Sequence, residues 1–258
     1  MANKLRIALV QTSIVWENPQ INRNLLEKKI NQISSDSDLI ILPEMFTSGF
    51  TMQPEKINID EGQKTIDWML EIAFEKQMAI TGSIVFFEDN KFYNRLFFVN
   101  PDGKLSHYDK RHTFTLAGET DAYKAGINKV IIDYKGFKIC PLICYDLRFP
   151  VWARNIESYD VLFYVANWPK PRINAWDTLL KARAIENMAY CIGVNRIGVD
   201  EVGHEYPGHS AVYDALGSRL MFSKKEEILY ATLDKEHLIS TRDKLKFLED
   251  KDHFTLTI

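Results

Sequence analysis

Three residues that could carry acyl-transfer chemistry each stand at or just beyond the end of a strand-like segment. Their side chains carry a carboxylate, an ammonium and a thiol. They are Glu44 after residues 38–42, Lys110 after residues 104–108 and Cys144 after residues 137–143. Sites in open α/β sheets gather beyond the carboxyl ends of strands. A catalytic site can therefore be built from these three groups.

The chemistry follows from the properties of the thiol. A free cysteine with a pKa of about 8.5 is mostly protonated at neutral pH and needs a base or a nearby cation. Glu44 could take the thiol proton while Cys144 attacks a carbonyl carbon. The ammonium of Lys110 and the backbone N–H of Tyr145 could then stabilise the oxyanion. A thioester would form and be cleaved by water with Glu44 again as base, which fits amide hydrolysis.

Each residue also has an ordinary structural interpretation. Cysteine is among the most buried residue types, so Cys144 alone could be a core residue. A single glutamate or lysine is more often a surface charge. Glu44 is less typical of a surface residue, because it stands between an apolar strand and Met45-Phe46. Spacing alone leaves open whether the three side chains converge.

The elements that would position these residues are read from hydrophobic periodicity. Strands are predicted at residues 5–11, 38–42, 79–87, 92–100, 104–108, 130–134, 137–143, 161–166, 190–196, 210–214 and 228–233. Helices are predicted at residues 22–33, around 66–74, 176–188 and 234–246. Phe74 and Ile185 fall on the apolar faces of two of them. Alternating strands and helices, interrupted by hairpins, favour an α/β sandwich, and the absence of repeats or linkers favours one domain over residues 1–258.

Composition excludes several classes of protein. The chain has 258 residues, a net charge of −3, 46% hydrophobic and 26% charged residues, the profile of a soluble globular protein. No basic block indicates nucleic-acid binding, and no apolar run reaches the roughly 18 to 20 residues of a membrane span. The N-terminal segment lacks signal-peptide features, which favours the cytoplasm.

Cysteine and histidine usage argues against disulfides and metals. Three cysteines, Cys140, Cys144 and Cys191, leave at least one free thiol and make a disulfide framework improbable. His204 and His209 form only a weak metal pattern, because a proline and a glycine interrupt any helix that would align them. The sequence contains no phosphate-binding glycine motif. We expect neither a metal nor a nucleotide cofactor.

His112 suggests an alternative pairing for Cys144, that of a Cys–His protease. The sequence lacks the local cysteine contexts of papain-like and caspase-like enzymes. We expect His112 to support the loop around Lys110 by hydrogen bonding instead.

Three ordered segments resemble the signature blocks of the nitrilase (carbon–nitrogen hydrolase) superfamily. These are Leu42–Phe46, Tyr108–His112 and Ile143–Pro150. Lys181–Asn187 and Gly208–Ser210 resemble later blocks, so the similarity spans most of the chain. The resemblance implies a four-layer α-β-β-α sandwich, no cofactor, and a homodimer or larger assembly that pairs through the helical layer.

The resemblance also implies a role for particular residues. Cys144 matches the nucleophile, Glu44 the general base and Lys110 the cation that stabilises the tetrahedral intermediate. Glu119, in Ala-Gly-Glu-Thr, resembles a second glutamate that supports the lysine. The backbone amide of Tyr145 would complete the oxyanion hole.

Within the superfamily the blocks are similar to those of the omega-amidase branch. Members of that branch hydrolyse the terminal amide of 2-oxoglutaramate or 2-oxosuccinamate to the 2-oxo acid and ammonia. Such a substrate carries a carboxylate, for which Arg148, Lys170 and Arg172 are candidate ligands. Each could instead be an ordinary loop charge, and Arg148 could pair with a nearby carboxylate. Trp168, at a strand end, either forms a wall of the pocket or only packs there.

Two alternatives stay open on the sequence. The same Glu–Lys–Cys site could serve a nitrile, an N-carbamoyl amine or another small amide. A non-catalytic binding protein could retain the fold, although the intact Glu44, Lys110 and Cys144 argue against this. Phe46, Phe114 and Tyr123 could line the entrance to a site or simply pack.

Overall fold

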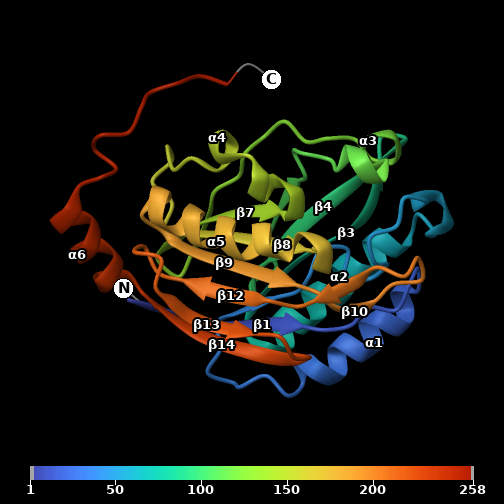
Figure 1. Ribbon diagram of the computed structural model, residues 1–258. Coiled ribbons are helices and arrows are strands. Elements are labelled where there is room, and N and C mark those ends of the chain that lie inside the picture. Colours follow the sequence, from blue (N-terminus) through green and yellow to red (C-terminus); the bar gives the residue numbers. More distant parts are fainter. Residues whose placement is uncertain (1–2, 257–258) are drawn as a thin grey trace.

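The computed structural model describes residues 3–256, which form two six-stranded β-sheets packed face to face (Figure 1). The first sheet has the strand order β14-β1-β2-β3-β4-β5. Its strands are β1 (Lys4–Gln11), β2 (Leu39–Ile41), β3 (Ala79–Glu88), β4 (Lys91–Val99), β5 (Leu105–Asp109) and β14 (Glu227–Asp234). Strands β1, β2 and β3 run parallel, and the others pair antiparallel.

The second sheet has the same plan, with the order β13-β12-β9-β8-β7-β6. Its strands are β6 (Ile132–Tyr134), β7 (Phe137–Ile143), β8 (Val161–Ala166), β9 (Tyr190–Asn195), β12 (Ser210–Tyr213) and β13 (Arg219–Ser223). Here β7, β8 and β9 are the parallel strands. A separate ribbon pairs β10 (Ile197–Val199) with β11 (Glu205–Pro207).

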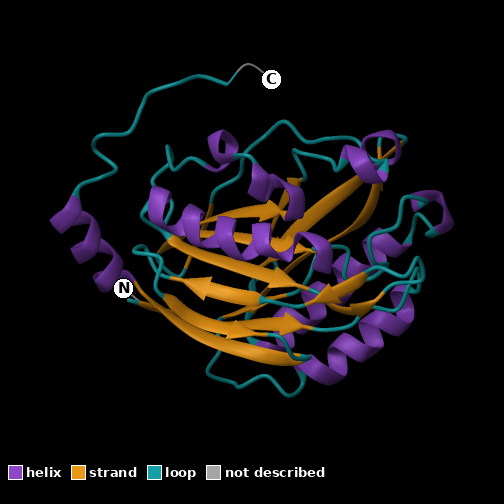
Figure 2. Ribbon diagram, viewed as in Figure 1, coloured by secondary structure: helices purple, strands orange, loops and turns teal. Residues whose placement is uncertain are grey.

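Helices cover the outer faces of the two sheets (Figure 2). The α-helices are α1 (Pro19–Ile30), α2 (Glu61–Lys76), α3 (Glu119–Ala122), α4 (Pro150–Ala153), α5 (Ile173–Asn187) and α6 (Lys235–Leu245). Short 3₁₀ helices are η1 (Pro54–Lys56), η2 (Thr115–Ala117), η3 (Cys144–Arg148) and η4 (Lys170–Arg172). None of the helices in residues 3–256 has both the length and the apolar composition needed to cross a bilayer.

The hydrophobic core explains the layering. Leu26 of α1 and Met69 of α2 pack with Ile40 and Ile80 on the outer face of the first sheet. The inward faces of both sheets and the inner side of α5 share a second cluster. Alternate residues of a strand face opposite sides of a sheet, so each sheet can serve two layers at once. The result is the expected four-layer α-β-β-α sandwich.

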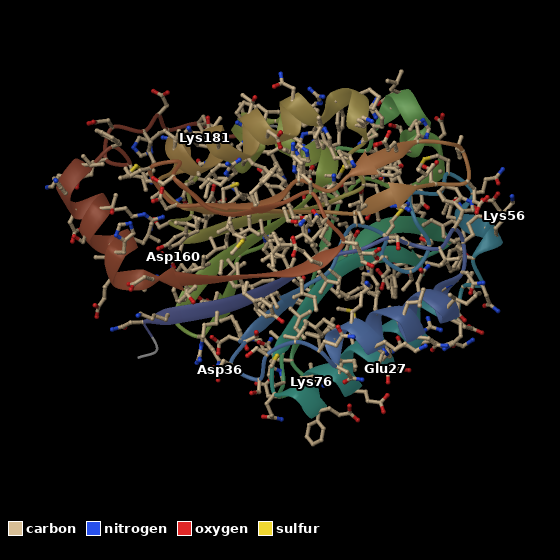
Figure 3. All side chains as sticks on the ribbon, turned by 60° about the horizontal axis from the view of Figure 1, so that its bottom comes forward. Glu27, Asp36, Lys56, Lys76, Asp160 and Lys181 are labelled. Carbon is tan, nitrogen blue, oxygen red and sulfur yellow. The ribbon has the colours of Figure 1, made fainter. Side chains whose placement is uncertain are left out.

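Side chains in Figure 3 mark the two outer layers. Glu27 on α1 and Lys181 on α5 are exposed and point to solvent on opposite sides of the molecule. Between the layers, Tyr134 of the second sheet donates a hydrogen bond of 2.7 Å to the backbone oxygen of Asp38, which directly precedes β2 of the first sheet. The two sheets are therefore joined by a polar contact as well as by apolar packing.

The predicted strands and helices are present, with shifted ends. The first predicted helix begins at Pro19, because Asn18 caps it, and ends at Ile30 rather than residue 33. Phe74 and Ile185, expected on apolar faces, are 70% and 45% exposed. Strands β10, β11 and β13 have no counterpart in the sequence-based prediction. Each is a short or half-exposed strand without a sustained apolar run.

Candidate active site

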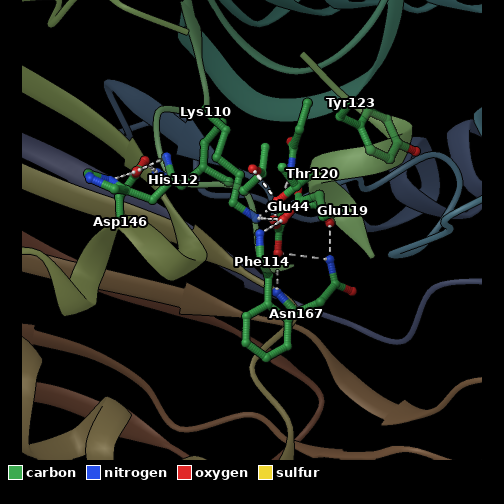
Figure 4. Close-up of polar contacts among 12 residues, drawn as sticks. Glu44, Lys110, His112, Phe114, Glu119, Thr120, Tyr123, Asp146 and Asn167 are labelled. Carbon is green, nitrogen blue, oxygen red and sulfur yellow. Dashed lines mark hydrogen bonds and ion pairs between the residues drawn. The ribbon is translucent and has the colours of Figure 1, made fainter. Parts of the chain in front are cut away.

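Glu44, Lys110 and Glu119 meet in the interior although they come from distant parts of the chain (Figure 4). Glu44 follows β2, Lys110 follows β5, and Glu119 begins α3. The Nζ of Lys110 lies 2.8 Å from Oε1 of Glu44, and 2.9 and 2.8 Å from the two carboxylate oxygens of Glu119. All three side chains are at most 1% exposed. One ammonium therefore bridges two buried carboxylates.

Cys144 completes this group from the second sheet. It follows β7 directly and is the first residue of η3, with φ at +43°. This left-handed conformation is unfavourable for a residue with a Cβ. It turns the chain sharply at the strand end, and the residue remains 8% exposed. Glu44 and Lys110 both lie near enough to influence the pKa of the thiol.

Two asparagines hold the Glu44 carboxylate in place. Asn94 of β4 donates through Nδ2 to Oε1 of Glu44 at 2.8 Å and to Oε1 of Glu119 at 3.1 Å. The backbone N–H of Asn167, after β8, donates to Oε2 of Glu44 at 2.8 Å. The Asn167 side-chain Nδ2 donates to the Glu44 backbone oxygen at 2.8 Å. Both oxygens of the Glu44 carboxylate are thus held by protein groups.

Glu119 has its own anchor in the loop that precedes it. The backbone N–H of Phe114 donates to Oε2 of Glu119 at 2.6 Å. The 3₁₀ turn η2 and Gly118, with φ at +81°, fold the chain back so that this contact can form. The glutamate is therefore held by two side chains and one backbone amide.

The charges of the site shift the pKa values in a consistent way. Burial raises the pKa of the Cys144 thiol well above its ordinary value, and the negative charge of Glu44 adds to this effect. Burial acts to lower the pKa of Lys110, but the two carboxylates outweigh it, and the pKa is raised. Burial, opposed by Lys110, raises the pKa of Glu119. The resting site thus contains a neutral thiol beside a charged lysine.

Asp146 links the loop of Lys110 to the loop of Cys144. Its Oδ2 accepts from the Tyr108 hydroxyl at 2.8 Å and from the Ile143 N–H at 3.0 Å. Its Oδ1 accepts from the backbone N–H of His112 at 2.9 Å and lies 2.8 Å from the ring Nδ1 of that histidine. His112 also stacks on Phe149, with ring centroids 3.7 Å apart. Through these contacts His112 supports the loop around Lys110, as the sequence predicts.

A cavity of about 530 Å³ opens onto Cys144. Its volume is within the range of roughly 300 to 1,000 Å³ that is common for small-molecule sites. Its wall combines aromatic and other apolar side chains with several polar and charged groups. The lining includes Trp16, Phe50, Phe114, Cys144, Tyr145, Arg148, Asn167, Trp168, Arg172, Asp200 and Tyr206.

The candidate substrate-binding residues lie on this wall. Arg148 stacks over the ring of Trp168 at 5.1 Å, and Arg172 over the ring of Phe114 at 5.0 Å. Within residues 3–256 neither arginine forms an ion pair, so the alternative interpretation of Arg148 as a partner of a nearby carboxylate is wrong. Lys170 does not line the cavity and pairs with Glu205 at 2.7 Å.

The aromatic candidates divide between wall and core. Trp168 is 3% exposed, lines the cavity and donates through Nε1 to the backbone oxygen of Arg172 at 2.8 Å. Phe114 lies on the wall as well, whereas Phe46 is a core residue of the first sheet. Tyr123 is buried, and its hydroxyl donates to the Thr51 backbone oxygen at 2.8 Å.

Tyr145 follows Cys144 in the first turn of η3. Backbone N–H groups in the first turn of a helix have no acceptor within the helix. The amide of Tyr145 thus belongs to the class of donors that oxyanion holes use. Its ring lies on the cavity wall and packs edge-on against Phe149, with centroids 5.1 Å apart.

The histidines that formed the weak metal pattern do not share a ligand set, although His204 lies on the cavity wall. His204 pairs with Asp200 at 3.4 Å and His209 with Asp177 at 2.9 Å, so the two histidines have separate partners. The described residues contain no group of three side chains with metal-binding geometry. Cys140 and Cys191 are buried core residues, as predicted.

Sequence reasoning missed Asn94 and Asn167. One feature of the sequence could have identified both residues. Each is a polar residue within or next to an otherwise buried strand segment. A buried polar side chain needs a partner, and here the partner is Glu44. Nothing in the sequence identifies that partner, since it lies 50 residues away from Asn94 and 123 from Asn167.

Comparison with known proteins agrees with this geometry. The omega-amidase YafV of Yersinia enterocolitica is 41% identical to the chain over 254 residues, 98% of each protein. The 2-oxoglutaramate amidase of Bacillus subtilis is 30% identical and covers 96% of this chain and 97% of its own length.

A solved structure and a family model extend the comparison. The crystal structure of XC1258 from Xanthomonas campestris, a CN-hydrolase superfamily protein with an arsenic adduct in its active site, is 40% identical. It superimposes with a TM-score of 0.95 over 98% of this chain and 99% of its own. The model of the carbon-nitrogen hydrolase family matches residues 6–243. The chain therefore belongs to the carbon-nitrogen hydrolase family, the nitrilase superfamily.

Proposed function

We propose that this protein is an omega-amidase, which hydrolyses the terminal amide of a small 2-oxo dicarboxylic monoamide such as 2-oxoglutaramate or 2-oxosuccinamate. The products are the 2-oxo acid and ammonia. The proposal rests on the similarity to two proteins with these names and on the groups that surround Cys144. The single observation that carries it is the Glu44–Lys110–Glu119 cluster beside a thiol at the end of a cavity.

The first half of the reaction forms a thioester. Because the thiol is neutral at rest, Glu44 must take its proton as the sulfur of Cys144 attacks the amide carbon. Lys110 and the backbone amide of Tyr145 stabilise the oxyanion, and one such donor is typically worth about 3 to 4 kcal/mol. Glu44 then returns the proton to the amide nitrogen, the C–N bond breaks, and ammonia leaves.

The second half hydrolyses the thioester. Glu44 takes a proton from a water molecule as its oxygen attacks the acyl carbon, and the same donors stabilise the second oxyanion. The C–S bond breaks, the sulfur recovers the proton from Glu44, and the carboxylic acid leaves. Glu119 touches Lys110 rather than the reacting atoms. It is a positioning residue that holds the ammonium in place.

The substrate's own carboxylate needs a cationic partner in the cavity. Arg148 and Arg172 suit this role, since both line the cavity and form no ion pair within residues 3–256. Asp200, the acidic residue on the wall among residues 3–256, already accepts hydrogen bonds from the Tyr206 hydroxyl and two backbone amides. An anionic ligand would therefore meet a net positive wall. Trp168 orients Arg148 by stacking under it.

A substrate panel tests this function. Ammonia release is measured from 2-oxoglutaramate, glutamine, an uncharged amide of similar length, a simple nitrile and an N-carbamoyl amino acid. We expect the highest kcat/KM with 2-oxoglutaramate, and at least about tenfold less with the uncharged amide, which lacks the charge-assisted contact. A preference for the nitrile or the carbamoyl compound would overturn the assignment.

We further propose a homodimer that works in the cytoplasm. Ile185 on α5 is 45% exposed and lies beside the turn that holds Leu216, itself 49% exposed, so an apolar patch stands on the outer helical layer. Light scattering should give twice the chain mass of 29.9 kDa, and Ile185→Lys should shift the protein toward monomer. A monomeric wild-type protein would contradict the dimer, and cell fractionation tests the location.

A further inference from the structure

Asn195, the last residue of β9, binds the backbone of the loop that follows β8. Its Oδ1 accepts the N–H of Trp168 at 2.7 Å. Its Nδ2 donates to the Trp168 carbonyl at 3.0 Å and to the Gly208 carbonyl at 2.7 Å. These partners fix which end of the amide is oxygen and occupy both of its N–H donors. The side chain is fully buried, and it holds both backbone groups of Trp168.

This contact continues the pairing of two strands beyond the end of one of them. Strands β8 and β9 pair in parallel up to Ala166 and Asn195. Within a sheet, the backbone of the neighbouring strand would hold the residues that follow. Here the side chain of Asn195 does so for Trp168, two residues after the end of β8. The loop after β8 is therefore anchored by hydrogen bonds although it lies outside the sheet.

The loop that Asn195 anchors carries two parts of the site. The backbone N–H of Asn167 donates to Oε2 of Glu44 (Figure 4). The ring of Trp168 lies on the cavity wall and stacks with Arg148 at 5.1 Å. Asn195 itself is not on that wall. Any effect of Asn195 on the reaction must therefore pass through its neighbours.

We propose that Asn195 is a positioning residue, which sets the orientation of the Glu44 carboxylate and the place of the Trp168–Arg148 pair. This inference rests on the proposed amidase function, in which Glu44 is the base and Arg148 meets the substrate carboxylate. Without the Asn195 amide, both backbone groups of Trp168 lose their partner, and the loop can shift. The value of kcat then falls, and so does the preference for an amide that carries a carboxylate.

A second buried asparagine makes the same kinds of contact at the opposite end of β8. Oδ1 of Asn155 accepts the N–H of Tyr159 at 2.8 Å, and Nδ2 donates to the carbonyls of Tyr159 and Asn187 at 2.9 and 3.0 Å. Asn155 is also fully buried, and it is not on the cavity wall. The two asparagines therefore match in burial and in the hydrogen bonds of their side-chain amides, but differ in place.

Asn195→Ala and Asn155→Ala separate positioning from stability. The value of kcat/KM is measured for 2-oxoglutaramate and for an uncharged amide of similar length. The ratio of the two values does not depend on how much of the enzyme is folded. We expect the ratio to fall about fivefold or more in Asn195→Ala, because a displaced wall weakens the contact with the substrate carboxylate. In Asn155→Ala it should stay within about twofold of the wild type.

The same kinetics report on Glu44. The value of kcat, corrected for the folded fraction, should fall about tenfold in Asn195→Ala and stay within about twofold in Asn155→Ala. An unchanged ratio or an unchanged kcat in folded Asn195→Ala, or equal losses in both variants, would overturn the proposal.

A milder pair of variants keeps the test decisive if Asn195→Ala does not fold. Asn195→Ser and Asn155→Ser then replace the alanine variants, because a hydroxyl can still pair with one of the partners. The expected differences have the same direction, and the same outcomes would contradict them. A wild-type enzyme without a preference for 2-oxoglutaramate over the uncharged amide would instead overturn the proposed function, so the two failures are distinguishable.

Discussion

At the scale of single residues, the site depends on one positive charge between two negative ones. Lys110 is 1% exposed, and both of its carboxylate partners are fully buried. A buried ion pair adds little net stability, but removing one partner leaves an uncompensated charge. The lysine is thus needed for the stability of the protein as well as for the proposed chemistry.

Lys110→Met should therefore lower the free energy of unfolding by about 3 kcal/mol or more. Adding Glu119→Gln to this variant removes one of the stranded charges and should recover a large part of the loss. Urea unfolding measures both effects, and neither variant should release ammonia. Equal stabilities of Lys110→Met and the wild type would show that the cluster does not carry these charges.

The protonation state of Cys144 is a second property of a single residue. Burial and the charge of Glu44 raise its pKa well above the ordinary value, so the thiol form persists at neutral pH. The difference in ultraviolet thiolate absorbance between the wild type and Cys144→Ala isolates this group during a pH titration. We expect no thiolate step at or below pH 9.0. A step near neutral pH would indicate a thiolate–cation pair in place of a thiol activated by Glu44.

At the scale of elements, strand ends and the loops after them bring the groups together. The sequence predicts that Glu44, Lys110 and Cys144 follow strands. Apolar runs end just before Glu44 and at Cys144, and the Pro101-Asp102-Gly103 turn indicates the strand before Lys110. Convergence could not be predicted from the residues alone, since it depends on which strands are neighbours. The left-handed backbone conformations of Cys144 and Met45, with φ of +43° and +45°, could not be predicted from the sequence either. Such conformations are imposed by tertiary packing against local preference.

Asp146 makes the loop arrangement testable, because one carboxylate accepts from four donors. Asparagine has a single acceptor oxygen, so Asp146→Asn should leave about two donors unpaired and cost about 2 to 4 kcal/mol of unfolding free energy. The value of kcat should fall about tenfold or more, since Lys110 and Cys144 lose a shared anchor. Urea unfolding and steady-state kinetics measure the two effects.

Asp214→Asn is the control for Asp146. One oxygen of Asp214 accepts the N–H groups of Leu216 and Ser218 at 2.9 and 2.8 Å in a turn away from the site. Asparagine can make both contacts, so stability and kcat should stay close to those of the wild type. A similar loss of kcat in both variants would mean that the effect of Asp146 is not specific to the site.

At the scale of the whole molecule, the site requires both sheets. The first sheet positions Glu44, Asn94 and Lys110, and the second positions Cys144 and Asn167. The resemblance implied this sandwich, and periodicity predicted most of its strands, since buried parallel strands are continuous apolar runs. The short strands β10, β11 and β13 were missed because half-exposed segments lack that signal. The cavity could not be predicted, because its wall comes from loops far apart in the sequence.

The central claim is that Cys144 attacks the amide of a 2-oxo acid. Ammonia release from 2-oxoglutaramate by the wild type and by Cys144→Ala tests it most directly, with circular dichroism to verify that both are folded. We predict rapid release by the wild type and none above the uncatalysed rate by Cys144→Ala. Release by a folded Cys144→Ala variant at a rate near that of the wild type would contradict the mechanism.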